Sequence, residues 1–279
     1  MTPKYWLLLL VKFENMKTRV ISVLNLVVIL CLMSCGGNRQ NTVVCSQENT
    51  EIQDFPTDTT VIVSETDSLI LYKPIFFGGI GMDCEYNCEP AVTNNRIFVA
   101  AGAYTKTYKW TEFADTLVAG PYVDGKFYEG YTAPANSGAF YYVHSARRWG
   151  FAHHGYEQVL RDIAKNEENG TAFSQVMLVY NGALCSIDEN ARPYKSTLRR
   201  AICDIDNELY IVDSKYDMNM YEFAKCLKAA RVFHGLYMDM GYMRYSAYKT
   251  SYEGEWIEIH PRNPLTKYCS NYIVFYYVD

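Results

Sequence analysis

Cationic side chains gather in residues 141–155, directly before an expected helix. Two arginines and three histidines bracket Trp149 in this stretch: His144, Arg147, Arg148, His153 and His154. A cationic loop at a helix N-terminus can hold phosphate or another anion through its charge and the backbone N–H groups. His153 and His154 are adjacent rather than spaced to ligate one ion, so zinc is not expected. The stretch is therefore a candidate anion-binding site without a metal.

Cys84 and Cys88 are spaced closely enough to form a disulfide or to contribute to a metal site. A disulfide between them would close a small loop in an oxidising compartment, and two unreacted thiols are an equal alternative. A zinc site is disfavoured, because no second Cys/His pair stands nearby at ligand spacing. Cys203 and Cys226 lie on apolar faces of expected elements, which is typical of small core residues. We therefore expect no metal and no cofactor.

The composition indicates a globular protein with a substantial core. The 279 residues are 49% hydrophobic and only 20% charged, which excludes a disordered chain. The net charge of −5 argues against a nucleic-acid partner, because phosphate neutralisation needs clustered Lys and Arg. The 25 tyrosines combine apolar rings with polar tips, so they suit both core packing and wet binding surfaces.

The first thirty-five residues carry an export pattern. Met16-Lys17-Thr18-Arg19 is basic, and residues 20–33 are almost wholly apolar. This run is shorter than the roughly 20 residues of a membrane-spanning helix. Leu32-Met33-Ser34-Cys35 resembles a bacterial lipobox, in which the leader is cut before an acylated Cys. We expect residues 1–34 to be a signal peptide, with Met16 as the better start. The alternative is an uncleaved N-terminal anchor helix.

The resemblance to a lipobox implies a location in the bacterial cell envelope. Acyl chains on Cys35 would anchor the protein to a membrane. Gly36 follows the Cys where an acidic residue would favour the inner membrane, so the outer membrane is expected, with the periplasmic or surface face left open. Residues 35–60 are rich in polar side chains and predict a flexible tether. Residues 61–279 contain no second linker and predict one globular domain.

Short β-type runs dominate this domain, with two helices among them. Residues 198–203 and 209–212 predict a hairpin joined by a polar loop. One helix is expected over residues 156–166, and another begins at Asn219, which has capping-box spacing to Glu222. Residues 235–238 then predict an interior strand that ends before Asp239. The order predicts an α+β or α/β fold, with a mixed, strand-rich sheet core and a few packed helices in a single domain.

Three segments in this order resemble the phosphodiester glycosidase family, which includes N-acetylglucosamine-1-phosphodiester alpha-N-acetylglucosaminidases. They are residues 174–182, residues 199–213, and residues 235–241 after the capped helix. An earlier Asn-Gly-Gly-Phe-type strand end of the family is echoed by Ala101-Gly102-Ala103-Tyr104. The resemblance covers roughly residues 96–248. It identifies the chain as similar to a divergent bacterial lipoprotein member of this family.

Several residues of this chain match positions in the motifs of this family. The matching residues are Gly102, Ser174, Asn181, Gly182, Arg199, Asp239 and Gly241. The family's Gly-Pro is replaced by Gln175-Val176, and the Asn before Gly102 by Ala101. Met240 replaces the first Gly of the Asp-Gly-Gly turn, and Met243 stands near the expected Ser. The bulky Met240 would narrow or block a pocket there.

The resemblance implies catalysis by Arg199 and Asp239. The Arg199 guanidinium would hold a phosphate, since its planar fork donates bidentately to oxygens. Asp239 would be at the reacting centre, as a base, a nucleophile or a stabiliser of an oxocarbenium-like carbon. Gly102, Ser174, Asn181 and Gly241 would bind substrate or shape the turns. The second carboxylate that glycosidases commonly use has three candidates: Asp204, Asp213 and Glu222.

Three functions remain open on the sequence. The first is an envelope lipoprotein that hydrolyses a glycosyl phosphodiester or related glycan. The second is a catalytically degenerate module that binds a glycan, a sugar phosphate or a protein, which Met240 and Met243 favour. The third is a structural envelope component. The hydrolase requires Arg199 and Asp239 to share an open pocket at one sheet end. The tyrosines near residues 237–252 could stack on sugar rings or pack in the core.

Overall fold

The computed structural model describes residues 58–75, 80–86, 95–103, 105–109, 112–118, 120–129, 137–165, 170–187, 196–241, 244–269 and 271–277. All of them belong to one compact unit, residues 54–279. The expected signal peptide, the lipid site Cys35 and most of the tether lie outside the described residues, as do Cys88 and Met243. No described helix is long and apolar enough to cross a membrane.

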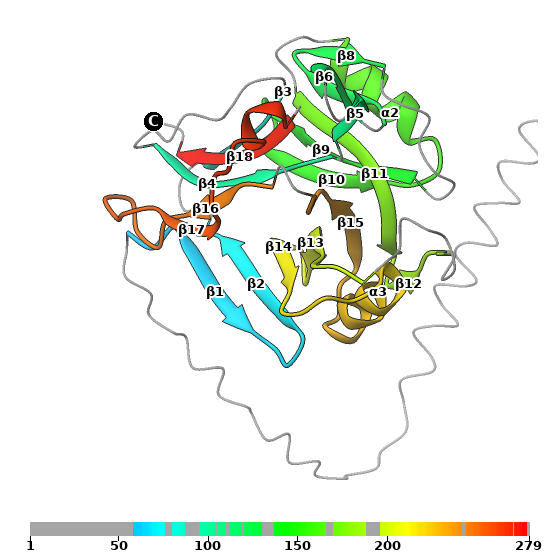
Figure 1. Ribbon diagram of the computed structural model, residues 1–279. Coiled ribbons are helices and arrows are strands. Elements are labelled where there is room, and N and C mark those ends of the chain that lie inside the picture. Colours follow the sequence, from blue (N-terminus) through cyan, green and yellow to red (C-terminus); the bar gives the residue numbers. More distant parts are fainter. Residues whose placement is uncertain are drawn as a thin grey trace, which may run out of the picture. The chain divides into compact units, whose positions relative to one another are not determined.

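Antiparallel strands make up most of this unit (Figure 1). The largest sheet has eleven strands, with the central order β1-β2-β14-β13-β15-β11-β7-β8 and with β9, β10 and β12 paired beside this path. Its strands are β1 (Val61–Glu65), β2 (Leu69–Pro74), β7 (Tyr122–Asp124), β8 (Lys126–Tyr128), β9 (Ser137–Val143), β10 (Arg148–Ala152), β11 (Gly170–Tyr180), β12 (Ala183–Leu184), β13 (Arg200–Ile205), β14 (Glu208–Ser214) and β15 (His234–Met238).

Two smaller sheets complete the described strands. The five-stranded sheet has the order β17-β16-β4-β18-β3 and consists of β3 (Ile80–Tyr86), β4 (Arg96–Ala101), β16 (Ser246–Tyr248), β17 (Ile257–His260) and β18 (Asn271–Tyr277). A separate hairpin pairs β5 (Thr105–Lys109) with β6 (Glu112–Val118). The described helices are α2 (Tyr156–Ala164), α3 (Met220–Ala229) and a short 3₁₀ helix, η2 (Thr266–Tyr268).

The predicted α+β or α/β class was wrong: the described unit is mostly β. Every pair of strands within the described residues is antiparallel, including β13 with both β14 and β15. Helix α3 does connect β14 to β15, which run in the same direction on either side of β13. A sequence of strand, helix and strand therefore suggested a mixed sheet, but the intervening antiparallel strand keeps like-directed strands apart.

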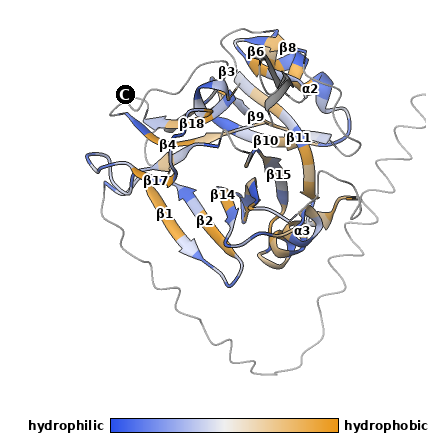
Figure 2. Cartoon of the chain, viewed as in Figure 1, coloured by the Kyte–Doolittle hydropathy of each residue, from blue (hydrophilic) through white to orange (hydrophobic). Residues whose placement is uncertain are grey.

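The second helix begins as the sequence predicts. The Asn219 side chain accepts from the Glu222 backbone N–H at 2.8 Å, and the Glu222 carboxylate accepts from the Asn219 N–H at 3.0 Å. This capping box satisfies two backbone donors of the first turn. Met220, Phe223, Ala224 and Leu227 are buried, and α3 as a whole carries both hydrophobic and hydrophilic residues (Figure 2).

The hairpin of β13 and β14 is also confirmed. It turns through Asp206 and Asn207, whose φ angles are 53° and 63°. Two consecutive left-handed residues match the right-handed twist of a tight antiparallel hairpin, and Asp and Asn tolerate this region. The turn sets the register that pairs Arg200 with Asp213 at the far end of the hairpin.

The core has two main layers, one on each face of β13. Ile202 packs in a cluster that joins the large and five-stranded sheets and includes Phe98, Ile211 and Phe275. Ala201 and Cys203 pack in the cluster under α3. Successive side chains of a strand point to opposite faces. Two neighbouring arginines at the start of β13 must therefore face different layers.

Candidate functional site

Arg199 and Asp239 lie at the same end of the large sheet. Arg199 directly precedes β13, and Asp239 directly follows β15. The antiparallel register pairs Arg200 with Met238, so the two flanking residues leave the sheet side by side. The structure brings these two positions together, although they are 40 residues apart in sequence. Both side chains are, however, buried from solvent.

The Arg199 side chain is held on the α3 side of the sheet. Its Nε donates to the Met218 carbonyl at 3.1 Å, and its Nη1 donates to the Tyr237 hydroxyl at 3.3 Å. The guanidinium lies 5.7 Å from the Tyr237 ring centroid. Only 2% of the residue is exposed. These contacts are those of a buried structural cation, and Arg199 does not line either of the two cavities described below.

Asp239 is likewise buried, with 3% exposure. Its backbone N–H donates to the Gly102 carbonyl at 2.7 Å, and its Oδ1 accepts from the Gly241 N–H at 2.8 Å. A Cβ on Gly241 would lie 3.1 Å from that oxygen, and one on Gly102 would lie 2.7 Å from Asn271 Oδ1. Both glycines therefore permit a close approach, and Gly102, Asp239 and Gly241 lie together.

Ser174 and Asn181 lie elsewhere. Ser174 is buried inside β11, where it pairs with Ala139 of β9. Asn181 forms the turn after β11 with a left-handed φ of 52°, and its Oδ1 lies 3.1 Å from Nε2 of His234. His234 begins β15, whereas Asp239 follows its end. Asn181 and Asp239 are therefore at opposite ends of that strand, and Asn181 is at the end remote from Arg199.

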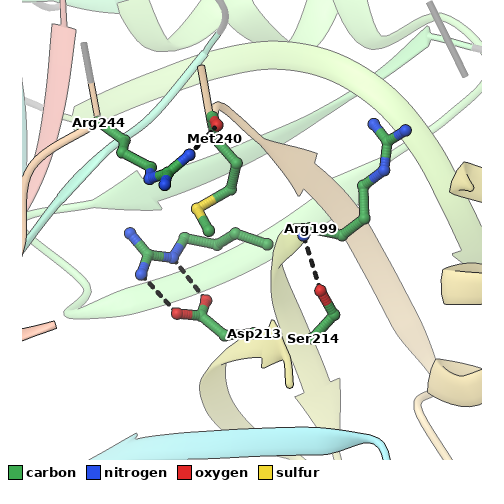
Figure 3. Close-up of polar contacts among 6 residues, drawn as sticks. Arg199, Asp213, Ser214, Met240 and Arg244 are labelled. Atoms are coloured by element: carbon green, nitrogen blue, oxygen red, sulfur yellow. Dashed lines mark hydrogen bonds and ion pairs between the residues drawn. The ribbon is translucent and has the colours of Figure 1, made fainter. Parts of the chain in front are cut away.

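The residue that sequence reasoning missed is Arg200. Its Nε and Nη2 each donate to one oxygen of Asp213 at 2.6 Å. Both side chains are interior, with exposures of 0% and 4%. Figure 3 shows that the Arg199 side chain points away from Asp213. The alternation of side chains along β13 could have revealed Arg200. Arg200 is two residues from Ile202 and therefore faces the same layer of the core, whereas Arg199 faces the other.

Met240 closes the end of the sheet above this ion pair. It is 3% exposed, and its carbonyl accepts from Arg244 Nη1 at 3.2 Å (Figure 3). Met240, which stands where the family has a glycine, is thus a packed interior side chain. Arg199 and Asp239 therefore share a sheet end that is sealed by packed side chains rather than open to water.

A cavity of about 340 Å³ lies between the edge of the large sheet and the five-stranded sheet. We call it the crevice. The large sheet contributes Tyr72 of β2 and Asp213 of β14, and the other sheet contributes Tyr248, Glu258 and His260. Of the three candidate second carboxylates, Asp213 alone lines it. Asp204 is bonded to His234 and the Asn207 N–H, and Glu222 belongs to the capping box.

Burial and charge set the protonation states in the crevice. Burial, with the Arg200 and Arg244 guanidinium groups nearby, lowers the pKa of His260 to about 4, although Asp213 acts in the opposite direction. Burial and then the Asp213 carboxylate raise the pKa of Tyr72 above its usual value. At neutral pH the crevice therefore offers a neutral imidazole and an intact phenol beside carboxylates.

Three buried polar atoms around Arg200 have no hydrogen-bond partner among the described residues. They are Arg200 Nη1, His260 Nε2 and Ser246 Oγ. Ser246 pairs with His260 across β16 and β17, so two of these atoms belong to neighbouring residues. Buried polar atoms nearly always have a partner in folded proteins. Of these three residues only His260 lines the crevice, and buried unpaired atoms of this kind fit bound water.

Metal ligation and disulfides have little support in the described part of the chain. It contains no group of three or more His, Cys, Asp and Glu residues that could hold a metal ion. Cys185, Cys203, Cys226 and Cys269 are free thiols. Burial raises the pKa of the Cys203 thiol, as expected for a small core residue. The two alternatives for Cys84 and Cys88, a disulfide or two unreacted thiols, both stay predictions, because Cys88 lies outside the described residues.

The fold and the crevice define a mostly β protein with a polar cavity between two antiparallel sheets. A scan against family models and a search of curated proteins gave no match. Among solved structures, the catalytic domain of zebrafish N-acetylglucosamine-1-phosphodiester alpha-N-acetylglucosaminidase, auto-inhibited by its pro-peptide, matches with a TM-score of 0.52 and 14% identity. The match covers 81% of this chain and 85% of that one.

A hypothetical protein from Synechocystis matches with a TM-score of 0.42 and 12% identity, over 77% of this chain and 61% of that one. The zebrafish comparison shows a distant relationship of fold. The chain is therefore similar in architecture to a phosphodiester glycosidase catalytic domain, and its own chemistry has to be argued from its own side chains.

Proposed function

We propose that this protein is a glycan-binding member of the phosphodiester glycosidase fold, with the crevice as its binding site. The observation that carries the proposal is the polar lining of the crevice, in which Tyr72, Asp213, Tyr248, Glu258 and His260 meet around one cavity of about 340 Å³. A bound sugar would supply hydroxyl groups that act both as donors and as acceptors. Such a ligand could pair with the carboxylate and phenol groups that line the cavity.

The crevice chemistry suits sugar hydroxyl groups. Asp213 and Glu258 are acceptors, and the Tyr72 and Tyr248 hydroxyls serve as donor or acceptor. The two tyrosine rings lie 5.5 Å apart between centroids, at an angle of 56°, so they add apolar surface. Small polar sites with a few aromatic walls fix ligand orientation through such placed groups. The burial of Arg199 and Asp239 argues against the hydrolase that was built on those two residues.

Binding is tested with the purified full-length chain in detergent on a glycan array, followed by titration calorimetry of the best glycan. Glu258→Ala removes an exposed acceptor at the rim, and the expected loss is about tenfold in affinity, or ~1.4 kcal/mol, within the range for charged hydrogen bonds. Glu255→Ala is the matched control, because Glu255 is an exposed carboxylate that does not line the crevice. Equal effects of both variants, or no glycan bound, would contradict the proposal.

Hydrolysis at the crevice is a second candidate, because two carboxylates, Asp213 and Glu258, line the same cavity. Glycosidases commonly act through such a pair. Water would add across the bond between the anomeric carbon and oxygen, releasing a free sugar and a phosphate monoester. The assay measures monoester release from glycosyl phosphodiesters. Loss of at least a hundredfold in Glu258→Gln, but not in Glu255→Gln, would support hydrolysis, and no release by the unaltered protein would exclude it.

We further propose that the protein is held in the bacterial envelope by lipid on Cys35. The support is the basic start, the short apolar run and the sequence Leu32-Met33-Ser34-Cys35. The polar residues after Cys35 would place the crevice-bearing unit at a distance from the membrane surface. A glycan-binding unit at that location would meet envelope polysaccharides.

A further inference from the structure

A second cavity, of about 630 Å³, lies at the other end of β13 and β15. We call it the β10 groove, because five consecutive residues from Arg147 to Phe151 line it. Strand β10 pairs only with β9 among the described strands, so one of its edges is left without a partner strand. The turn of β13 and β14, through Asp204 and Asn207, forms the opposite wall.

The β10 groove is separate from the crevice. Asp204 is in register with His234 at one end of β13 and β15, whereas Arg200 is in register with Met238 at the other. Four residues of extended strand span ~13 Å. The two cavities share no lining residue. Binding at one site can therefore be tested independently of binding at the other.

Two arginines give the groove a positive charge. Arg147 and Arg148 are exposed, and among the described residues neither guanidinium makes an ion pair or hydrogen bond. Arg147 has a left-handed φ of 49°, and its N–H donates to the His144 carbonyl at 3.1 Å, which closes the turn before β10. A non-glycine residue held in this region is uncommon and occurs often at functional loops.

The carboxylate in the groove does not neutralise these arginines. Asp204 Oδ2 lies 3.1 Å from Nδ1 of His234, and Oδ1 accepts from the Asn207 N–H at 3.1 Å. Asp204 is 5% exposed and is committed to these contacts. The free guanidinium groups of Arg147 and Arg148 can therefore bind an incoming anion bidentately.

Aromatic rings form the rest of the groove. A Cβ on Gly150 would lie 2.5 Å from the Tyr141 ring, so the glycine lets that ring lie flat against the backbone of β10. Trp149 is half-buried and meets Phe151 edge to face at 6.0 Å between centroids. Phe151 in turn stacks on His234 at 5.4 Å and 13°. The walls are thereby fixed by ring packing, which leaves aromatic surface beside the cations.

We propose that the β10 groove binds a sugar that carries an anionic group, either a phosphate or a carboxylate. The arginines would hold the anion, and Trp149 would contact the apolar face of the sugar ring. The cavity volume lies within the range of small-molecule sites. This assignment goes beyond the glycan site in the crevice, and it gives the protein two sugar-binding sites of different charge preference.

The test uses titration calorimetry and tryptophan fluorescence of the full-length chain in detergent at low salt. The probes are glucose 6-phosphate, glucuronate, glucose and inorganic phosphate. The expected result is that at least one of the two anionic sugars binds tenfold or more tightly than glucose and phosphate and changes Trp149 fluorescence. The stronger of glucose 6-phosphate and glucuronate identifies the preferred anion. Absence of binding by both would overturn the proposal.

Variants locate the binding. Arg147→Gln and Arg148→Gln should each lower affinity about tenfold, with unchanged melting temperature because both side chains are exposed. Arg231→Gln is the matched control, since this exposed arginine pairs with Asp206 at 3.7 Å outside the groove lining. Glu258→Ala in the crevice should also leave the affinity unchanged. Binding that survives both groove variants, that is lost in Glu258→Ala, or that inorganic phosphate matches would overturn the assignment.

Discussion

Arg200 and Asp213 join β13 to β14 through two hydrogen bonds of 2.6 Å, in the interior between two sheets. Neither side chain is more than 4% exposed. The pair uses both carboxylate oxygens and two guanidinium nitrogens, and leaves Arg200 Nη1 without a described partner. A buried charge of this kind is tolerated only when its counter-charge is held in place. The geometry therefore ties the stability of the central hairpin to the wall of the crevice.

Removal of one member of this pair should be costly. Arg200→Met leaves the Asp213 carboxylate buried without its cation, and the expected loss is about 3–5 kcal/mol in the free energy of unfolding. Urea unfolding followed by circular dichroism measures this loss. The double variant Arg200→Met/Asp213→Leu removes both charges and should recover most of it, because an apolar pair needs no desolvated counter-charge. A double variant as unstable as the single one would contradict this account.

Protonation of His260 should destabilise the protein at acidic pH. Its pKa is about 4 in the folded protein, against an ordinary value of 6.5. Between these values the unfolded chain binds a proton that the folded chain does not, so stability falls as pH falls from about 6.5 towards 4. Because the ring is partly exposed, we expect a loss of about 1 kcal/mol between pH 7.5 and 5.

Urea unfolding at the two pH values measures this difference. His260→Gln keeps a polar side chain without the titration, and should reduce the pH dependence by that amount. His154→Gln serves as the control, because His154 is an exposed imidazole in another part of the unit. A pH dependence that stays the same in His260→Gln would show that other groups cause it.

The capping box of α3 should contribute measurably to stability. Asn219→Ala removes the acceptor of the Glu222 N–H, and the expected loss is about 1 kcal/mol. Asn219→Gly should cost less, since glycine is itself tolerated at this position. Thermal or urea unfolding of the two variants gives the comparison. An alanine variant as stable as the unaltered protein would mean that the packing of Phe223 and Leu227 alone fixes the start of the helix.

Cys35 should decide membrane attachment. Cys35→Ala removes the thiol that the lipobox would present for acylation, so the mature protein should move from the membrane fraction to the soluble fraction of a bacterial host. Mass spectrometry of the unaltered protein should show acyl chains on Cys35, each buried methylene contributing ~0.8 kcal/mol to anchoring. Cys45→Ala controls for the general loss of a thiol. Membrane retention of the Cys35 variant would favour an uncleaved anchor helix.

Local sequence patterns determined several features of this protein. The Asn219–Glu222 spacing predicts the start of α3, and the polar run from Asp204 to Asn207 predicts a hairpin loop, which the structure shortens to Asp206 and Asn207. The apolar run before Asp239 predicts the end of β15. These features depend on hydrogen bonds and backbone preferences within a few residues, so the local sequence is enough to predict them.

Tertiary structure alone decided the sheet class and the site. Antiparallel pairing of β15 with β13 and β11 depends on contacts between distant segments, and strand patterns do not specify partners. Which of Arg199 and Arg200 faces Asp213 depends on a shift of a single residue along the strand, because successive side chains point to opposite faces. The crevice is formed by side chains of two sheets, so Asp213 meets His260 only when those sheets pack together.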